Sequence, residues 1–237
     1  MSSGASPSSI TFSWQGVKDG LKLAPILSTP AAVFGLAYGV YARQSGLNLA
    51  EALAMSLSVF AGASQFAVTG LYTQSAPLLV MLVAAFAINV RFFLQGAALQ
   101  PYIRHLPKSR ILPSLFLLAD GNWAYTLKAC KEGRCDVAML PAAGLTIAIP
   151  WVIFTYLGHA VGAGIADPRI FGLDFILYAM FASMLPRSWS GRLDLIGWGV
   201  AALGAIAMMR AGYPEWGIAV GALAGSLAGG MARVRQY

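Results

Sequence analysis

Charged residues are scarce in this chain, and their scarcity excludes the surface of a soluble protein. Only 11% of the 237 residues are Asp, Glu, Lys or Arg, whereas 58% are hydrophobic. Soluble globular domains carry about 25% charged residues. The chain also has only two histidines and two cysteines, and it lacks a glycine-rich phosphate-binding loop. We therefore expect no cofactor, and neither ATP-driven nor redox chemistry.

The charges that remain are mostly basic and give a net charge of +7. In a soluble protein this excess would favour a nucleic-acid partner. In a chain dominated by apolar runs, basic cytoplasmic loops and contact with anionic lipid headgroups explain it better. We expect the lipid bilayer as a partner, and no nucleic acid.

The two cysteines, Cys130 and Cys135, lie in the short loop from Lys128 to Asp136. No histidine lies near them, so they form at most half of a zinc site. We expect free thiols on the reducing side of the membrane.

Long apolar segments dominate what is present, and a membrane-spanning helix needs about 20 such residues. The candidate segments are 21–42, 50–72, 76–99, 113–129, 137–161, 172–186, 193–210 and 214–232. They predict an all-α, polytopic membrane helix bundle of six to eight segments, some of them broken or re-entrant.

One transmembrane domain accounts for most of the chain, over residues 21–232. Residues 1–20 form a Ser-rich N-terminal tail without the basic region of a cleaved signal, and we expect it to be partly disordered. Residues 233–237 form a short cytoplasmic tail. The expected location is the bacterial cytoplasmic (inner) membrane, as a multi-pass protein.

Lys and Arg residues indicate the orientation, because cytoplasmic loops are enriched in them. If segment 113–129 does not cross, the basic residues of loops 100–112 and 128–136 share one side, and seven crossings place the N-terminus outside. If segment 50–72 also enters and returns, six crossings place both termini inside. The loop 100–136 and the C-terminus are cytoplasmic in both arrangements, and the side of the N-terminus stays open.

Small residues and prolines mark the packing of the helices. Glycines recur every four residues along the last segment, at Gly217, Gly221, Gly225 and Gly229. This spacing lines one helix face and lets another helix approach closely. Packing within the bundle or an interface with a second membrane subunit would use such a face. Pro150 lies midway along segment 137–161, where we expect it to kink or break the helix.

Polar residues inside segment 50–72 fall at helical spacing. The stripe consists of Glu51, Met55, Ser58, Gly62, Gln65, Thr69 and Tyr72. A side chain such as Gln65 is costly in hydrocarbon unless it faces a protein interior or a wet cavity. We therefore expect Ser58, Gly62, Gln65 and the neighbouring Ser64 to line a substrate route.

Arg91 lies deep within segment 76–99, two residues after Asn89. An Arg at mid-bilayer costs about 2.5–3.5 kcal/mol, and no carboxylate lies within one helical turn. A substrate carboxylate, Asp120 or Glu51 must therefore be its partner. We favour the substrate, with Asp120 near its ammonium group.

An apolar run leads directly into Asp120-Gly121-Asn122. Broken helices in transporters expose backbone groups and helix ends that bind ions and zwitterions. We expect Asp120 and Asn122 to join Asn89 and Arg91 in binding substrate.

An intramembrane hydrolase is the enzymatic alternative, because Ser64 and His159 could form a nucleophile and base. Gln65 follows Ser64, however, where a membrane serine protease would have Gly, and His159 lies near the end of its segment. We do not expect an enzyme.

Several motifs together resemble the AzlC/YgaZ family. They are Gly35-Leu36-Ala37-Tyr38-Gly39-Val40, Ala42-Arg43-Gln44-Ser45-Gly46-Leu47, Phe60-Ala61-Gly62-Ala63-Ser64-Gln65-Phe66-Ala67 and Asn89-Val90-Arg91. Their order and spacing match over about residues 20–130, and the later Gly172-Leu173-Asp174-Phe175 is also similar. The combination is specific, although each motif alone would be weak.

The resemblance implies the large subunit of a branched-chain amino acid exporter, which works with a small AzlD/YgaH-type membrane protein. Phe92 stands where the family commonly has His, and Gly121 follows Asp120 where the family tends to have Glu, so the substrate or coupling ion can differ. A membrane scaffold or assembly subunit without transport of its own is the main alternative. A channel is a weaker one, because no ring of like charges is visible.

Overall fold

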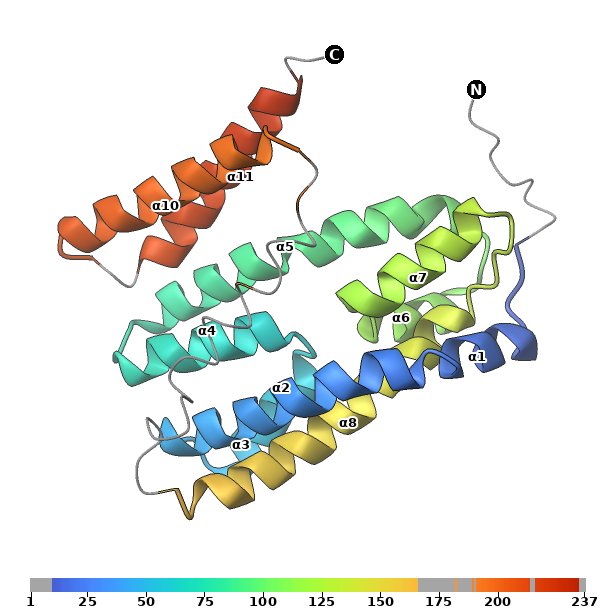
Figure 1. Ribbon diagram of the computed structural model, residues 1–237, viewed down its shortest axis with the longest axis horizontal. Helices are drawn as coiled ribbons and strands as arrows, with labels where there is room; N and C mark the ends of the chain where they lie inside the picture. The colour runs from blue at the N-terminus through green and yellow to red at the C-terminus, as the bar shows by residue number, and fades with distance from the viewer. Residues whose placement is uncertain (1–9, 166–181, 183–188, 190, 214–215, 235–237) are drawn as a thin grey trace. The chain divides into compact units, whose positions relative to one another are not determined.

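The computed structural model describes all residues except 1–9, 166–181, 183–188, 190, 214–215 and 235–237 (Figure 1). Most of the described residues lie in helices. These helices are α1 (Trp14–Leu21), α2 (Ala24–Gln44), α3 (Leu49–Ser58), α4 (Gly62–Thr73), α5 (Leu78–Ile103), α6 (Lys108–Phe116), α7 (Asp120–Lys131), α8 (Met139–Gly162), α10 (Asp194–Arg210) and α11 (Gly217–Val234). The predicted all-α membrane bundle is confirmed.

Both segments suspected of being irregular are broken helices. Segment 50–72 is divided into α3 and α4, and segment 113–129 is divided into α6 and α7. Within the part of the chain that the structure describes, three helices, α2, α5 and α8, are long and apolar enough to cross a membrane. Segment 172–186 lies almost entirely outside the described residues.

The chain divides into two compact units, which are described separately. The first comprises residues 1–62 and 91–166, and the second comprises residues 63–90 and 167–237. The single membrane domain expected over residues 21–232 stays a prediction.

In the first unit, α2 and α8 lie side by side over much of their length (Figure 1). Glycines make the contact: Gly35 lies against the backbone of Trp151, and Gly39 lies against the carbonyl of Thr155. Because both contacts advance by four residues in the same direction, the two helices are parallel. A Cβ at Gly39 would overlap the Thr155 carbonyl oxygen, so this is a close backbone approach of the small-xxx-small kind.

Pro150 does not break α8, which continues from Met139 to Gly162. The expectation of a break there is wrong. Membrane helices tolerate an internal Pro because neighbouring groups satisfy the backbone carbonyl that it leaves free. The 24 residues of α8 extend for about 36 Å, which exceeds the roughly 30 Å of a hydrocarbon core.

The described part of the N-terminal tail, from residue 10, is attached to the start of α8. The Thr11 N–H donates to the Cys135 carbonyl at 3.0 Å, and the Val137 N–H donates to the Thr11 carbonyl at 2.9 Å. The tail then forms α1, which is capped by Ser13 and packs against α8. The part of the expected tail that the structure describes is therefore folded.

Asp136 holds this N-terminal attachment together. Its carboxylate accepts hydrogen bonds from the backbone N–H groups of Ser13 at 3.1 Å and Gly16 at 3.2 Å, and from the Ser13 hydroxyl. Burial raises the pKa of Asp136, but the hydrogen bonds from Ser13 and from the Ala138 N–H outweigh this effect and leave the pKa below its ordinary value. The attachment therefore uses an ionised carboxylate at neutral pH.

Cys130 and Cys135 are joined by a disulfide, so the expectation of free thiols is wrong. The chain reverses between them at Gly133, whose φ of +80° favours glycine. This turn brings the two Cα atoms within 3.9 Å. Short sequence spacing alone could not show that the turn closes in this way.

An apolar cluster packs several helix ends of the first unit together. It contains the end of α5, the disulfide and the start of α8, with partly buried residues of the N-terminal tail packed against it. Its buried members are Leu99, Ile103, Leu118, Cys130, Cys135, Val137 and Leu140. The guanidinium of Arg110, near the start of α6, lies 4.9 Å from the centre of the Phe12 ring. The start of α6 and the end of α7 thus lie at the same end of this unit.

This arrangement favours one membrane topology. We infer that α6 and α7 form a re-entrant pair, because both of its ends lie where α2 and α8 begin. The basic residues of the loops there predict a cytoplasmic side, which the N-terminal tail would share. Along the chain, α3 and α4 connect α2 to α5. If this pair enters from outside and returns, the second predicted arrangement holds.

Introduced cysteines test this topology in a background carrying Cys130→Ser and Cys135→Ser. A membrane-impermeant maleimide added to intact cells should label Ser45→Cys and Gln74→Cys. It should label Thr11→Cys and His105→Cys only after lysis. If Thr11→Cys were labelled from outside while His105→Cys stayed protected, the N-terminal tail and the loop after α5 would lie on opposite sides of the membrane. That result would contradict the inferred topology.

Glycine substitutions test the contact between α2 and α8. Gly39→Ala forces a methyl group into the Thr155 backbone and should destabilise the protein by about 1–3 kcal/mol. Gly96→Ala is the matched control: its Cβ would meet no atom within 4 Å, so it should stabilise α5 by about 0.5–1 kcal/mol. Thermal unfolding in detergent measures the stability of both variants. Equal changes in stability for Gly39→Ala and Gly96→Ala would refute the close approach of α2 and α8.

Candidate functional site

A charged pair joins α5 to the start of α7 within the first unit. Arg91 Nη1 lies 2.8 Å from Asp120 Oδ2, and Gln95 Nε2 donates to Asp120 Oδ1 at 2.8 Å. Arg91 therefore has a counter-ion within the chain. Asp120, one of the three expected partners, takes this place here, and a substrate carboxylate on Arg91 stays a prediction.

The break between α6 and α7 positions Asp120. Helix α6 ends at Phe116, Ala119 is extended with φ −140° and ψ 163°, and Asp120 begins α7. A carboxylate in the first turn of a helix is stabilised by the unpaired N–H groups and the positive end of the helix dipole. The Asp120 carboxylate is thus held by a helix end, an amide and a guanidinium.

The charged pair is partly open. The Arg91 side chain is 31% exposed and the Asp120 side chain is 43% exposed. Among the described residues, Arg91 Nε and Gln95 Oε1 have no hydrogen-bond partner. Buried polar atoms of this kind normally bind water or a ligand. The pair therefore retains hydrogen-bonding capacity for a polar ligand that displaces one of its members.

Asn122 maintains the helix break. Its Oδ1 accepts from the Ala119 N–H at 2.7 Å, and its Nδ2 donates to the carbonyls of Leu117 at 2.7 Å and Leu140 at 3.0 Å. The side chain is fully buried. The expectation that Asn122 binds substrate does not fit these contacts, because the amide already stabilises the backbone that α6 and α7 leave unpaired.

A second polar cluster lies in the second unit, at the start of α4. Asn89 Nδ2 donates to Ser64 Oγ at 3.1 Å. Ser64 and Gln65 are buried in the first turn of α4, with Thr69 one turn later. The Asn89 Oδ1 has no hydrogen-bond partner among the described residues. The predicted polar face of residues 64–69 is therefore internal, and Asn89 retains a free acceptor.

Other members of the predicted stripe have local roles. Glu51 forms a capping box with Asn48 at the start of α3, so it is not the counter-ion of Arg91. Ser58 is exposed and donates to the Ala54 carbonyl at 2.6 Å. A side chain at Gly62 would overlap the Trp151 ring. The break at residues 59–61 separates these residues from Gln65, which a continuous helix would not have done.

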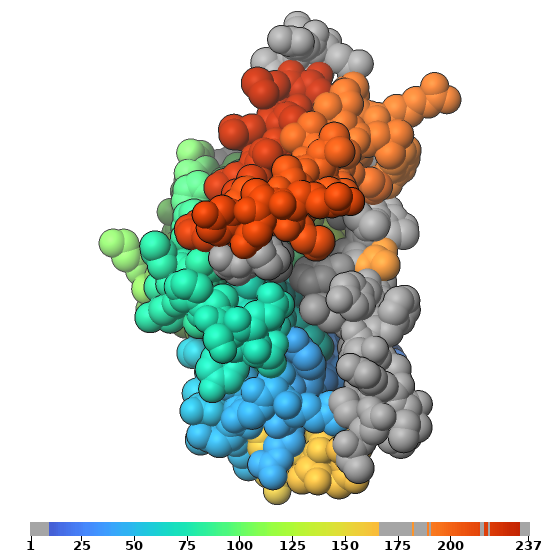
Figure 2. Space-filling model, turned by 90° about the vertical axis from the view of Figure 1, so that its left-hand side faces the viewer, coloured from blue at the N-terminus to red at the C-terminus, as the bar shows by residue number. Residues whose placement is uncertain are grey.

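A polar contact between α3 and α8 lies outside the predicted stripe. Trp151 Nε1 donates to Ser56 Oγ at 3.3 Å, and Ser56 Oγ lies 3.4 Å from Thr155 Oγ1. Figure 2 shows the blue residues of α2 and α3 against the yellow end of α8. Ser56 directly follows Met55 of the stripe. A polar residue in this apolar segment, one position away from the predicted polar face, was therefore the sequence signal for this contact.

His159 is a buried residue that holds a loop in place. Its Nε2 lies 2.9 Å from the Leu47 carbonyl oxygen, and the residue is 5% exposed. The contact ties the end of α8 to the loop between α2 and α3. This gives the hydrolase alternative no support from His159.

The glycine stripe of α11 faces α10 within the same hairpin. A Cβ at Gly221 would lie 2.7 Å from the Ala201 carbonyl oxygen, and one at Gly225 would lie 2.7 Å from that of Gly197. Gly217 and Gly229 also face α10. The stripe therefore serves helix packing within the chain, one of the two uses expected for it.

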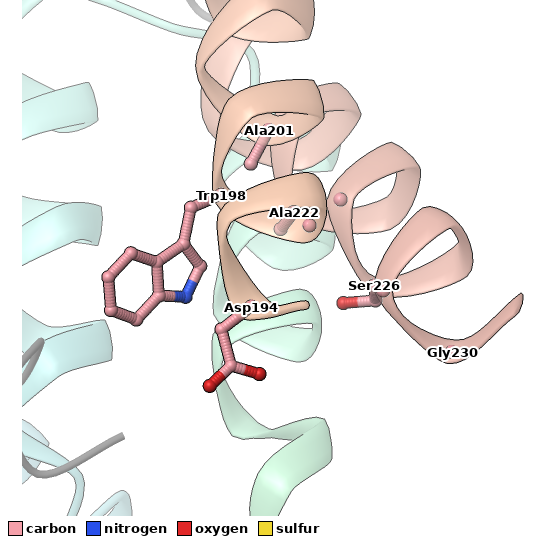
Figure 3. Close-up of a pocket in the computed structure, with 9 residues that line it drawn as sticks. Asp194, Trp198, Ala201, Ala222, Ser226 and Gly230 are labelled. Atoms are coloured by element: carbon pink, nitrogen blue, oxygen red, sulfur yellow. The ribbon is translucent and has the colours of Figure 1, made fainter. Parts of the chain in front are cut away.

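A groove of about 400 Å³ remains along this hairpin. Figure 3 shows Asp194 and Trp198 projecting from α10, with Ser226 on α11. The Asp194 carboxylate accepts from the Gly191 N–H at 3.1 Å, which stabilises the turn that starts α10. The groove is otherwise lined by glycine and alanine.

Comparison with known proteins identifies the family. The AzlC protein family matches residues 26–165, a range that includes both helix breaks and the Arg91–Asp120 pair. The chain belongs to the AzlC family. It is thus an integral membrane protein of a transporter-type family, and the resemblance found in its motifs is confirmed.

Individual relatives support the membrane location. The chain is 30% identical over 229 residues to inner membrane protein YgaZ of Escherichia coli (strain K12), which covers 94% of this chain and 89% of YgaZ. It is 32% identical over 157 residues to an uncharacterized membrane protein of Archaeoglobus fulgidus, covering 65% of this chain and 68% of that protein. No solved structure matches.

A double-mutant cycle measures the pair directly. Arg91→Ala should lower the yield of folded protein, because it leaves the Asp120 charge without its partner inside a membrane segment. Adding Asp120→Asn should recover much of that yield, with a coupling of about 0.5–3 kcal/mol in unfolding free energy. The Glu132→Ala change, in the exposed ion pair with Arg134, is the control and should have little effect. If the effects of Arg91→Ala and Asp120→Asn on the unfolding free energy simply add, the contact between the two residues contributes nothing to stability.

Proposed function

We propose that this AzlC-family protein exports aliphatic, branched-chain amino acids across the cytoplasmic membrane. The observation that carries the proposal is the partly open Arg91–Asp120 pair at a helix break. An amino acid is a zwitterion, so it matches this pair charge for charge. The resemblance to branched-chain amino acid exporters supplies the substrate class.

Exchange of ion-pair partners gives the proposed binding step. The substrate carboxylate occupies the guanidinium of Arg91, whose planar donors suit bidentate binding of a carboxylate. The Asp120 carboxylate, released from Arg91, takes the substrate ammonium group. No charge is left without a partner at any stage, which keeps the cost of opening the pair low inside a membrane.

The two helix breaks support a transport function rather than a fixed scaffold. Discontinuous helices in secondary transporters end near the membrane midplane and expose backbone groups at the substrate site. Here α3 and α6 both end partway along α8, at Ser58 and Phe116. A bundle held only by polar contacts between helices would not need such ends.

The small AzlD/YgaH-type partner stays part of the proposal. Its docking surface must be a face other than the glycine stripe of α11, because that stripe already contacts α10. A scaffold subunit without transport is the second candidate. It is favoured by the complete charge balance of the Arg91–Asp120 pair in the absence of ligand.

Transport measurements separate these candidates. Proteoliposomes carrying the protein, with its small partner added, should exchange external for internal leucine. Arg91→Lys keeps the charge but loses the planar donor pair, so it should reduce exchange by about tenfold or more while folded yield stays near wild type. The exposed Arg104→Lys is the matched control and should exchange normally. Normal exchange by Arg91→Lys would exclude the guanidinium as the carboxylate site.

A further inference from the structure

We propose that an apolar cavity between the ends of α3 and α6 binds the aliphatic side chain of the transported amino acid. The cavity lies in the first unit, against α8, and has a volume of about 370 Å³. Leu57 and Phe60 line it from the α3 end, Phe116 and Leu117 from the α6 end, and Ala148 and Ile149 from α8. This assignment rests on the function proposed above and adds the residues that select the substrate.

The lining suits an uncharged hydrocarbon group. Among the described residues, no charged side chain lines the cavity, and Ser56 is the only lining side chain with a polar group. The Ser56 hydroxyl already contacts Trp151 and Thr155. A polar or charged substrate side chain would therefore lose its hydration here without gaining a partner. The volume lies at the low end of about 300–1,000 Å³ for ligand pockets, as expected for a small ligand.

The cavity lining and the charged pair are close along the chain. Helix α6 ends at Phe116, Leu117 lines the cavity, and Asp120 follows three residues later as the first residue of α7. The last carbonyl groups of α3 and α6 carry the negative ends of their helix dipoles. An ammonium group at the mouth of the cavity would meet these carbonyls and Asp120, while the side chain on the neighbouring carbon enters the cavity.

Helix α8 gives the cavity its floor. Leu145, Ala148, Ile149, Val152 and Ile153 all line it, and their spacing of three and four residues places them on one helix face. Ala148 is the smallest of these side chains and lies in the middle of the set. The volume of the cavity over α8 therefore depends on the small side chain of Ala148.

The cavity wall that follows α3 contains a strained backbone residue. Phe60 has a φ of +44°, in a region that bulky residues rarely adopt. Such a conformation persists only where its surroundings hold it, and it is frequent at ligand-binding sites. At this position it ends the path of α3 and directs the chain into α4, with the Phe60 side chain lining the cavity.

Competition between substrates tests the assignment. In the exchange assay, Ala148→Phe fills the cavity and should lower leucine exchange relative to alanine exchange by about tenfold. Ala160→Phe, at an exposed position near the end of α8 outside the cavity, should leave that ratio unchanged. Phe116→Ala enlarges the cavity from an exposed position and should admit phenylalanine, so it tests the site even if Ala148→Phe folds poorly.

The outcomes separate this inference from the proposed function. If the wild-type protein exchanges neither leucine nor valine, the proposed function fails. If it exchanges leucine, but neither Ala148→Phe nor Phe116→Ala alters selectivity among amino acids, the cavity assignment fails. Loss of co-purified lipid in Ala148→Phe, with selectivity unchanged, would instead assign the cavity to an acyl chain and overturn the proposal.

Discussion

The parallel contact between α2 and α8 is the constraint on which the first unit depends. Gly35 and Gly39 allow the two backbones to approach closely, and they fix α8 beside α2. Both helix breaks then lie against α8. Gly62 packs under the Trp151 ring, and Gly144 leaves room for the Leu117 carbonyl and the Asn122 amide. A larger residue at any of these glycines would move a break, and with it Asp120 or Phe60.

The helix breaks convert this packing into chemistry. Backbone groups that a continuous helix would satisfy internally are unpaired where α6 stops and α7 starts, and Asn122 satisfies two of them. Asp120 is placed at the positive end of α7 and opposite Arg91. An apolar cavity and a charged pair consequently occur within a few residues of each other, which is the combination of groups that an aliphatic zwitterion requires.

Much of this could be predicted from residues alone. The long apolar runs predicted the helices, and the cost of Arg91 in hydrocarbon predicted a counter-ion among three candidates. The choice of Asp120 depends on contact between α5 and α7, which no spacing in the sequence reveals. The same limitation applies to Ser56, Thr155 and Trp151, which meet across α3 and α8. The two cysteines were misjudged because the turn at Gly133, rather than their spacing, decides whether they pair, and the predicted break at Pro150 does not occur because α8 continues through it.

Binding of leucine analogues tests the central claim, the exchange of ion-pair partners, most directly. Calorimetry on the purified complex would compare leucine with isopentylamine, which lacks the carboxylate, and with 4-methylpentanoate, which lacks the ammonium group. The account predicts that leucine binds and that each analogue binds at least about tenfold more weakly, because each leaves either Arg91 or Asp120 without a partner. Equal binding of leucine and either analogue would contradict the exchange of partners.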